Sequence, residues 1–181
     1  CTFCSNDFMW TNRYYIRDVD DVIDEISLYV ENLGINSVQF ADLTAILKGK
    51  WIVEFSDKIK TKYPNLVWTL PSGTRSEALS LDVLKHMASS GLKYLVYAPE
   101  SGSESTLQNI KKRISIDKMT ASIAYAISLG IPVRTNFIIG LPSESRRDVY
   151  KTIKLAIYYS FIGVEEAPLF PFQPYPGTEI F

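Results

Sequence analysis

The two cysteines of this 181-residue chain, Cys1 and Cys4, stand at its beginning with two residues between them. A pair of thiolates at this spacing is typical of a metal site or of a redox dithiol. The single histidine, His86, lies within a predicted helix, so the chain alone does not complete a tetrahedral zinc site of Cys and His ligands. Two interpretations of the cysteine pair therefore remain: a catalytic metal site, or a structural zinc site that takes further ligands from outside the chain.

The composition is that of a globular domain with balanced charge. Hydrophobic residues make up 46% of the chain, enough for one sizeable core, and we predict a single domain over residues 1–181. The 19 basic and 20 acidic side chains give a net charge of −1, without a basic patch for nucleic acid or an anionic membrane. The apolar runs are too short to span a bilayer. Because two cysteines make no disulfide scaffold, we expect a reducing, cytoplasmic location.

A helical pattern, a glycine and a short apolar run recur roughly every 30–40 residues, the size of one βα unit. The predicted helices cover residues 18–33, 49–63, 80–91, 117–130 and 143–161, with Asp18, Asp117 and Ser143 as expected caps. The predicted strands cover residues 35–41, 66–70, 93–98, 133–139 and 164–170. This alternation predicts an α/β fold with a parallel sheet, doubly wound or closed as a barrel, and argues against a thioredoxin-like dithiol. We expect a further strand before Cys1, because the chain opens in a loop that feeds a helix.

Polar residues follow the end of every predicted strand. In chain order they are Asp42, Ser72 with Arg75, Glu100 with Ser101, Gly140 with Glu144, and Gln173. Ligands bind at the carboxyl ends of parallel strands, so these residues and the cysteine loop should meet on one rim. Taken singly, Asp42 and Glu100 also suit turn acids, and the lysines and arginine of residues 111–113 suit a solvated charged run.

Five segments together resemble one family, the radical S-adenosylmethionine enzymes, in its cobalamin-binding-type branch. Cys1-Thr2-Phe3-Cys4 is similar to the second half of the family's cluster loop, Cys-x3-Cys-x-aromatic-Cys. The other four segments are Phe40-Ala41-Asp42, Glu100-Ser101-Gly102-Ser103 with Leu107 and Lys112, residues 137–144, and residues 174–179. They follow the order and spacing of the family over essentially the whole chain.

The resemblance implies a partial (β/α)6 TIM-like barrel with a parallel sheet, whose first strand is missing from this chain. It also implies a 4Fe–4S cluster on three thiolates, with one iron open to S-adenosylmethionine, whose cleavage gives a 5′-deoxyadenosyl radical. On the resemblance, Cys1 and Cys4 are cluster ligands. The implied cofactor-binding residues are Phe3 beside the adenine, Asp42 at the methionine amine, Arg75, Glu100 and Ser101 at the carboxylate, amine and ribose, and the Ile139-Gly140 backbone at the adenine.

The chain departs from the family pattern at its beginning. The first cluster cysteine would lie four residues before Cys1, so we expect this segment alone to bind a cluster poorly and to be inactive. A cobalamin domain, if present, would lie upstream. The resemblance also implies a reductant such as flavodoxin or ferredoxin, and it leaves open which small molecule or peptide is the substrate. The alternative is a non-catalytic α/β module in which Cys1 and Cys4 belong to a structural zinc site.

Overall fold

The computed structural model describes residues 1–181 except 10–13, 43, 45, 47 and 75–78. The helices are α1 (Asn6–Met9), α2 (Val19–Leu33), α3 (Gly49–Lys62), α4 (Leu81–Ser89), α5 (Glu104–Asn109), α6 (Ile116–Ser128) and α7 (Arg146–Phe161). The strands are β1 (Ser37–Gln39), β2 (Val67–Thr74), β3 (Leu92–Glu100), β4 (Val133–Ile139) and β5 (Leu169–Pro171). No helix among the described residues is long and apolar enough to cross a membrane.

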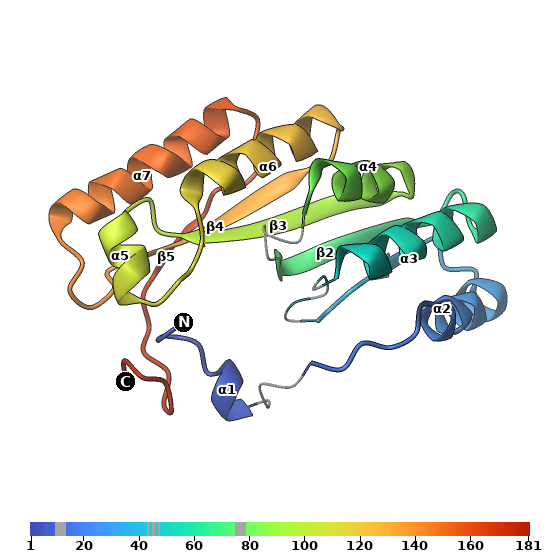
Figure 1. Cartoon of the computed structure of the whole chain (residues 1–181), viewed down its shortest axis with the longest axis horizontal. Helices are drawn as coiled ribbons and strands as arrows, with labels where there is room; N and C mark the ends of the chain where they lie inside the picture. Colours follow the sequence, from blue (N-terminus) through green and yellow to red (C-terminus); the bar gives the residue numbers. More distant parts are fainter. Residues whose placement is uncertain (10–13, 43, 45, 47, 75–78) are drawn as a thin grey trace.

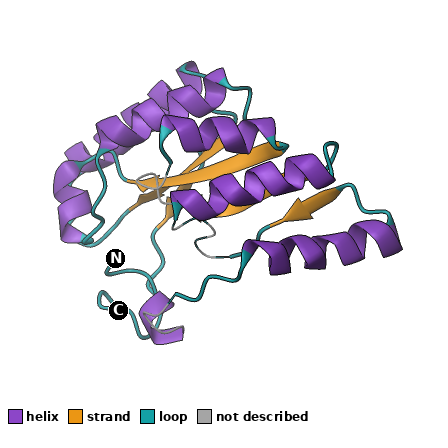
Figure 2. Ribbon diagram, turned by 45° about the vertical axis from the view of Figure 1, so that its right-hand side comes forward, coloured by secondary structure: helices purple, strands orange, loops and turns teal. Residues whose placement is uncertain are grey.

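The five strands form one parallel sheet in the order β1-β2-β3-β4-β5. Its first pair is parallel, with Val38 opposite Trp68, and the sheet stays open in the described residues. Helices α3, α4, α6 and α7 lie on one side of it (Figures 1 and 2). The α/β fold with a parallel sheet is therefore confirmed. The additional strand before Cys1 stays a prediction.

The core lies between the sheet and these helices. Trp68 on β2 has no exposed surface, and its ring meets that of Phe55 on α3 edge-on, with centroids 5.4 Å apart. Farther along the sheet, the buried hydroxyl of Tyr97 on β3 lies 2.8 Å from Ser122 Oγ on α6. These large side chains point to the helical side of the sheet. The polar residues follow the ends of the strands.

Local capping set most helix ends where the sequence predicts them, with two corrections. Asp18 caps α2 by accepting from the amide of Asp20 at 2.9 Å, as predicted. The predicted cap Asp117 lies inside the first turn of α6, whose true cap is Ser115. Likewise the predicted cap Ser143 stands in the left-handed region, with φ at 66°, and the cap of α7 is a later serine.

Strand limits differ more, and two helices were missed. The short helices α1 and α5 have no counterpart among the predicted elements. Strands β2 and β3 run farther than predicted, to Thr74 and Glu100, whereas β1 is shorter. The last predicted strand, residues 164–170, is displaced: Glu166 makes only an isolated bridge to Arg134, and the ladder starts at Leu169. Pro168 stands just before this ladder, and it has no N–H to donate.

Candidate functional site

The cysteine loop lies against α5, the helix that follows β3, and against the end of β4. The amide of Thr2 donates to the carbonyl of Ile110 at 3.0 Å, and the amide of Cys4 donates to that of Cys1 at 3.3 Å. Phe3 packs against a small cluster, separate from the main core, whose buried members are Leu107, Ile110 and Leu141. Both thiols are free and exposed. The fold thus holds the backbone of this loop and presents its two sulfurs to solvent.

The C-terminal segment packs against the same cluster as the cysteine loop. Phe172 and Ile180 pack on the cluster that Phe3 joins, and the ammonium of Lys111 pairs with Glu179. Figure 1 shows the two ends of the chain side by side beneath α5. Segments from the beginning, middle and end of the sequence therefore meet at one rim.

Glu100 ends β3 as a nearly buried acid, 8% exposed. Its Oε1 accepts from Lys112 Nζ at 2.9 Å, and the Lys112 side chain is 19% exposed. Burial raises the pKa of the Glu100 carboxyl, although the Lys112 ammonium acts in the opposite direction. Arg75, which the resemblance gives as another cofactor contact, lies outside the described residues.

Lys112 belongs to one of the family-like segments, but sequence reasoning predicted no contact with Glu100 for it and expected the charged run 111–113 to lie in solvent. The structure corrects this for Lys112, whose amide donates to the carbonyl of Leu107 at 2.8 Å. That turn brings its side chain back to the end of β3. The spacing between Glu100 and Lys112, with one short helix between them, was the available signal.

The backbone at Glu100 is strained, and the loop behind it is buried. Glu100 has φ at 64°, a conformation that costs a non-glycine residue about 1–2 kcal/mol. The next residues, Ser101 and Ser103, have no exposed surface, and Ser101 Oγ lies 3.0 Å from Thr152 Oγ1 on α7. In this structure the Ser101 hydroxyl is therefore buried against α7 and is not exposed to a cofactor.

Gly102 is required by close backbone approach, and its substitution is our first prediction. A Cβ at Gly102 would lie 2.5 Å from the carbonyl oxygen of Lys151 on α7. We expect Gly102→Ala to lower the free energy of unfolding by about 1–3 kcal/mol, because the loop must move away from the helix. Urea unfolding of both proteins measures this. Gly34→Ala is the control: its Cβ would meet nothing within 4 Å, so its cost comes only from φ at 66°.

The turn after β4 is held by the side chain of Glu144. Glu144 Oε2 accepts from the amide of Gly140 at 2.7 Å and from that of Leu141 at 3.3 Å. Gly140 has φ at 82°, and the carbonyl of Ile139 accepts from the amide of Phe172 at 2.8 Å. The Ile139-Gly140 backbone is thus fixed on the rim.

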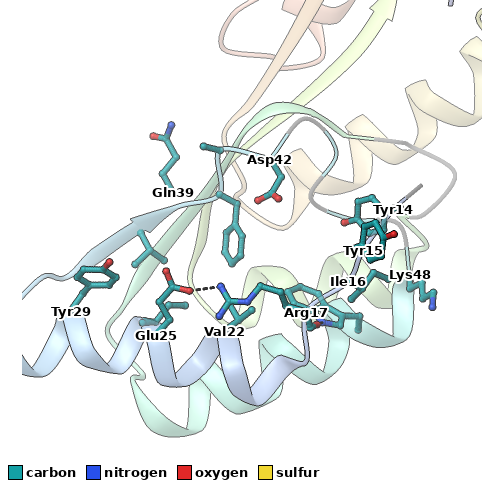
Figure 3. Close-up of a pocket in the computed structure, with 15 residues that line it drawn as sticks. Tyr14, Tyr15, Ile16, Arg17, Val22, Glu25, Tyr29, Gln39, Asp42 and Lys48 are labelled. Atoms are coloured by element: carbon teal, nitrogen blue, oxygen red, sulfur yellow. Dashed lines mark hydrogen bonds and ion pairs between the residues drawn. The ribbon is translucent and has the colours of Figure 1, made fainter. Parts of the chain in front are cut away.

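Asp42 lies elsewhere on the rim, at a cavity of 360 Å³ bordered by residues 14–17, helix α2 and strand β1. Figure 3 shows its carboxylate above this cavity, with the Arg17–Glu25 ion pair across from it. Burial, and secondly the charge of Asp42, raise the pKa of Tyr14. Neither Glu100 nor the cysteines line this cavity. The structure therefore groups the cysteine loop with the ends of β3 and β4, and it places Asp42 two strands away.

The two cysteines are the thiol side chains at this rim. Among the described residues, no three Cys, His, Asp or Glu side chains come together as a metal site. Two free thiols on an exposed turn are soft donors of the kind that iron–sulfur clusters use. The donor chemistry of these two thiols fits such a cluster.

Comparison with known families shows which family the chain belongs to. Residues 1–156 match the sequence profile of the Radical SAM superfamily. The chain belongs to the radical SAM superfamily. The order of motifs around the cysteine loop, Glu100 and Gly140 is therefore that of a radical SAM core, and the zinc-module alternative is not favoured.

Two curated relatives match this radical SAM core over nearly its whole length. An uncharacterized methyltransferase of Pyrococcus horikoshii is 30% identical over 181 residues, which is 100% of this chain and 38% of the relative. The cytidylyl-2-hydroxyethylphosphonate methyltransferase of Streptomyces wedmorensis is 29% identical, over 99% of this chain and 34% of the relative. The chain thus spans just over a third of the length of these relatives.

A solved structure shares the fold. The radical S-adenosylmethionine methyltransferase TsrM from Kitasatospora setae, solved with cobalamin and a [4Fe-4S] cluster, superposes with a TM-score of 0.82 at 13% identity. The superposition covers 99% of this chain and 33% of that protein. It supports the open parallel sheet with its one-sided helices as part of a larger radical SAM fold.

Proposed function

We propose that this chain is the core of an enzyme that cleaves S-adenosylmethionine reductively to start radical chemistry. Membership in the radical SAM superfamily carries the proposal. The rim supports it, because the cysteine loop packs against α5, which follows Glu100, and against Leu141 beside Gly140. The bound 4Fe–4S cluster would supply the electron for cleavage of the sulfonium.

Cys1 and Cys4 would hold the cluster with a third thiolate from the whole protein, and the residues around them would bind the cofactor. Phe3 would border the adenine, and the fixed Ile139-Gly140 backbone would approach the same base. The Glu100 carboxylate would accept from the cofactor's ammonium or ribose hydroxyls while Lys112 holds it in place.

The remaining predicted contacts are assigned more distant roles. Asp42 and Arg75 stay proposed partners of the methionine amine and carboxylate. Because Ser101 is buried and bonded to Thr152, we propose that it supports Glu100 and does not touch the ligand. Exclusion of water by the packed cluster beneath Phe3 would strengthen every electrostatic contact at the rim.

Methyl transfer is the reaction that we propose for the whole protein. Two relatives are named as methyltransferases, and the solved structure with the same fold is a methyltransferase with cobalamin bound. We therefore propose a cobalamin-binding domain outside this chain, with a reductant of the flavodoxin or ferredoxin type.

The test is made on the full-length protein, purified without oxygen and reconstituted with iron and sulfide. We expect about four irons per chain, a brown absorption band, and release of methionine and 5′-deoxyadenosine from S-adenosylmethionine under strong reductant. Methyl transfer is followed separately with S-adenosylmethionine labelled in its methyl group. Zinc in place of iron, without cleavage, would overturn the proposal.

A further inference from the structure

The buried loop that follows β3 is held by two side chains of one helix, α7. Thr152 Oγ1 lies 3.0 Å from Ser101 Oγ and accepts from the amide of Gly102 at 3.0 Å. Asp148, one turn earlier on the helix, accepts through Oδ1 from Ser103 Oγ at 2.6 Å. Thr152, Ser101 and Ser103 have no exposed surface. Three consecutive loop residues are therefore hydrogen-bonded directly to α7.

The hydrogen-bond directions at Thr152 follow from counting its donors and acceptors. A hydroxyl has one proton and two lone pairs, and the proton of Thr152 goes to the carbonyl of Asp148 at 3.1 Å. Its lone pairs then accept from the Gly102 amide and from the Ser101 hydroxyl. Ser101 Oγ in turn accepts from the amide of Ser103 at 3.1 Å. Replacing the Thr152 hydroxyl by a methyl group would leave two buried donors unpaired.

Asp148 holds the loop through a charge. Its Oδ1 accepts from Ser103 Oγ, from Ser105 Oγ at 3.2 Å and from Lys151 Nζ at 3.1 Å, while Oδ2 accepts from Ser145 Oγ at 2.5 Å. The hydrogen bond from Ser103, followed by those from Ser145 and Lys151, holds the pKa of Asp148 well below its ordinary range. The carboxylate is therefore ionised at neutral pH and bonds the loop and the helix cap at once.

The start of the same helix also holds the turn after β4. Ser145 caps α7 together with Asp148, and Glu144, the residue before it, accepts from the amides of Gly140 and Leu141. One helical segment thus fixes the loop after β3 and the turn after β4 relative to each other. These are the two strand ends that the proposed function uses for S-adenosylmethionine.

We propose that Thr152 and Asp148 are positioning residues. They fix the Glu100 carboxylate in place relative to the Gly140 backbone. This inference rests on the proposed function, because it is the cofactor that needs this spacing. Glu100 stands in the left-handed region, a strained state that persists only where the surroundings impose it. The hydrogen bonds to Thr152 and Asp148 begin at the very next residues, so loosening them releases that strain. Neither residue touches the ligand.

The test compares Thr152→Val and Thr152→Ser in the full-length protein. Amide hydrogen exchange over residues 100–105 reports the loop, and titration of S-adenosylmethionine into the cluster-loaded protein reports the site. For Thr152→Val we expect faster exchange in that segment and about tenfold weaker binding, with iron content unchanged. Serine keeps the hydroxyl, so Thr152→Ser should restore both readouts.

The matched control is Thr120→Val on α6. Thr120 also donates to the carbonyl four residues back, at 2.7 Å, and its second partner is the hydroxyl of Tyr159 at 2.9 Å, not the loop. It should leave exchange over residues 100–105 and binding unchanged. Should Thr152→Val not fold, Ser103→Ala removes the bond to Asp148 and the contact with Ser105 Oγ, and it is measured in the same way.

The outcomes separate this inference from the proposed function. If Thr152→Val weakens binding in the wild-type background but adds little to Glu100→Gln, the two residues act together and the inference is supported. Exchange that stays slow in Thr152→Val, or fast exchange with unchanged affinity, overturns it while the proposed function stands. A wild-type protein that binds no S-adenosylmethionine overturns both, whatever the exchange shows.

Discussion

Replacing Cys1 or Cys4 by alanine in the full-length protein should abolish the iron–sulfur cluster and with it all cleavage of S-adenosylmethionine. The proposed cluster would be held by three thiolates, and the loss of one would leave an iron without its protein ligand. Iron and sulfide analysis after anaerobic reconstitution measures the first effect, and 5′-deoxyadenosine release measures the second. Of the changes considered, these should have the largest effect.

The matched control for the cysteines is His86→Ala. His86 is the one histidine of the chain, and on α4 it bonds to Asp57 of α3 at 2.9 Å on the helical side of the sheet. Its loss should leave iron content and cleavage unchanged. A full cluster in both cysteine variants would show that the ligands lie elsewhere and would refute the assignment of this loop.

Replacing Glu100 by glutamine should weaken S-adenosylmethionine binding roughly ten- to a hundredfold. The expected loss is about 1.5–3 kcal/mol, the usual contribution of a hydrogen bond to a charged group. The glutamine oxygen can still accept from Lys112, so the loop should stay folded. Titration of the cofactor into the cluster-loaded variant gives the dissociation constant, and an unchanged value would mean that Glu100 does not contact the cofactor.

Glu166→Gln is the control at the opposite end of the sheet. Glu166 also pairs with a cation, Arg134, at 2.9 Å, but Arg134 stands near the start of β4. Equal losses of affinity in the Glu100 and Glu166 variants would indicate a general effect of removing a charge. We expect a loss only for Glu100.

The pH dependence of stability should differ between the wild type and Glu100→Gln. Burial raises the pKa of Glu100 above its ordinary 4.5, so the folded state holds this proton more tightly than the unfolded state. The resulting contribution to stability is complete below pH 4.5 and is lost as the pH rises through the raised pKa. We expect the unfolding free energy of the wild type, relative to Glu100→Gln, to fall over that window. Urea unfolding of the two proteins without cofactor measures it.

The features of the fold that depend on residues close together in the sequence were predictable. The helix cap at Asp18, the left-handed glycine at Gly34 and the limits of β4 all follow from local hydrogen bonding and side-chain pattern. Which of two similar residues close together in the sequence caps a helix was not predictable. Ser143 and Ser145 both precede α7, and only the backbone angle of Ser143 and the pairing of Ser145 with Asp148 decide which one caps it.

The sequence by itself determined the parallel α/β fold, the family and the strand ends that carry its motifs, because period, glycine placement and motif order are local properties. The tertiary structure decided what those residues contact. Lys112 became the partner of Glu100, and Ser101 turned from the rim toward Thr152 on α7. Both outcomes depend on loops that return from far along the chain, and on the cost of leaving buried donors and charges unpaired once they meet.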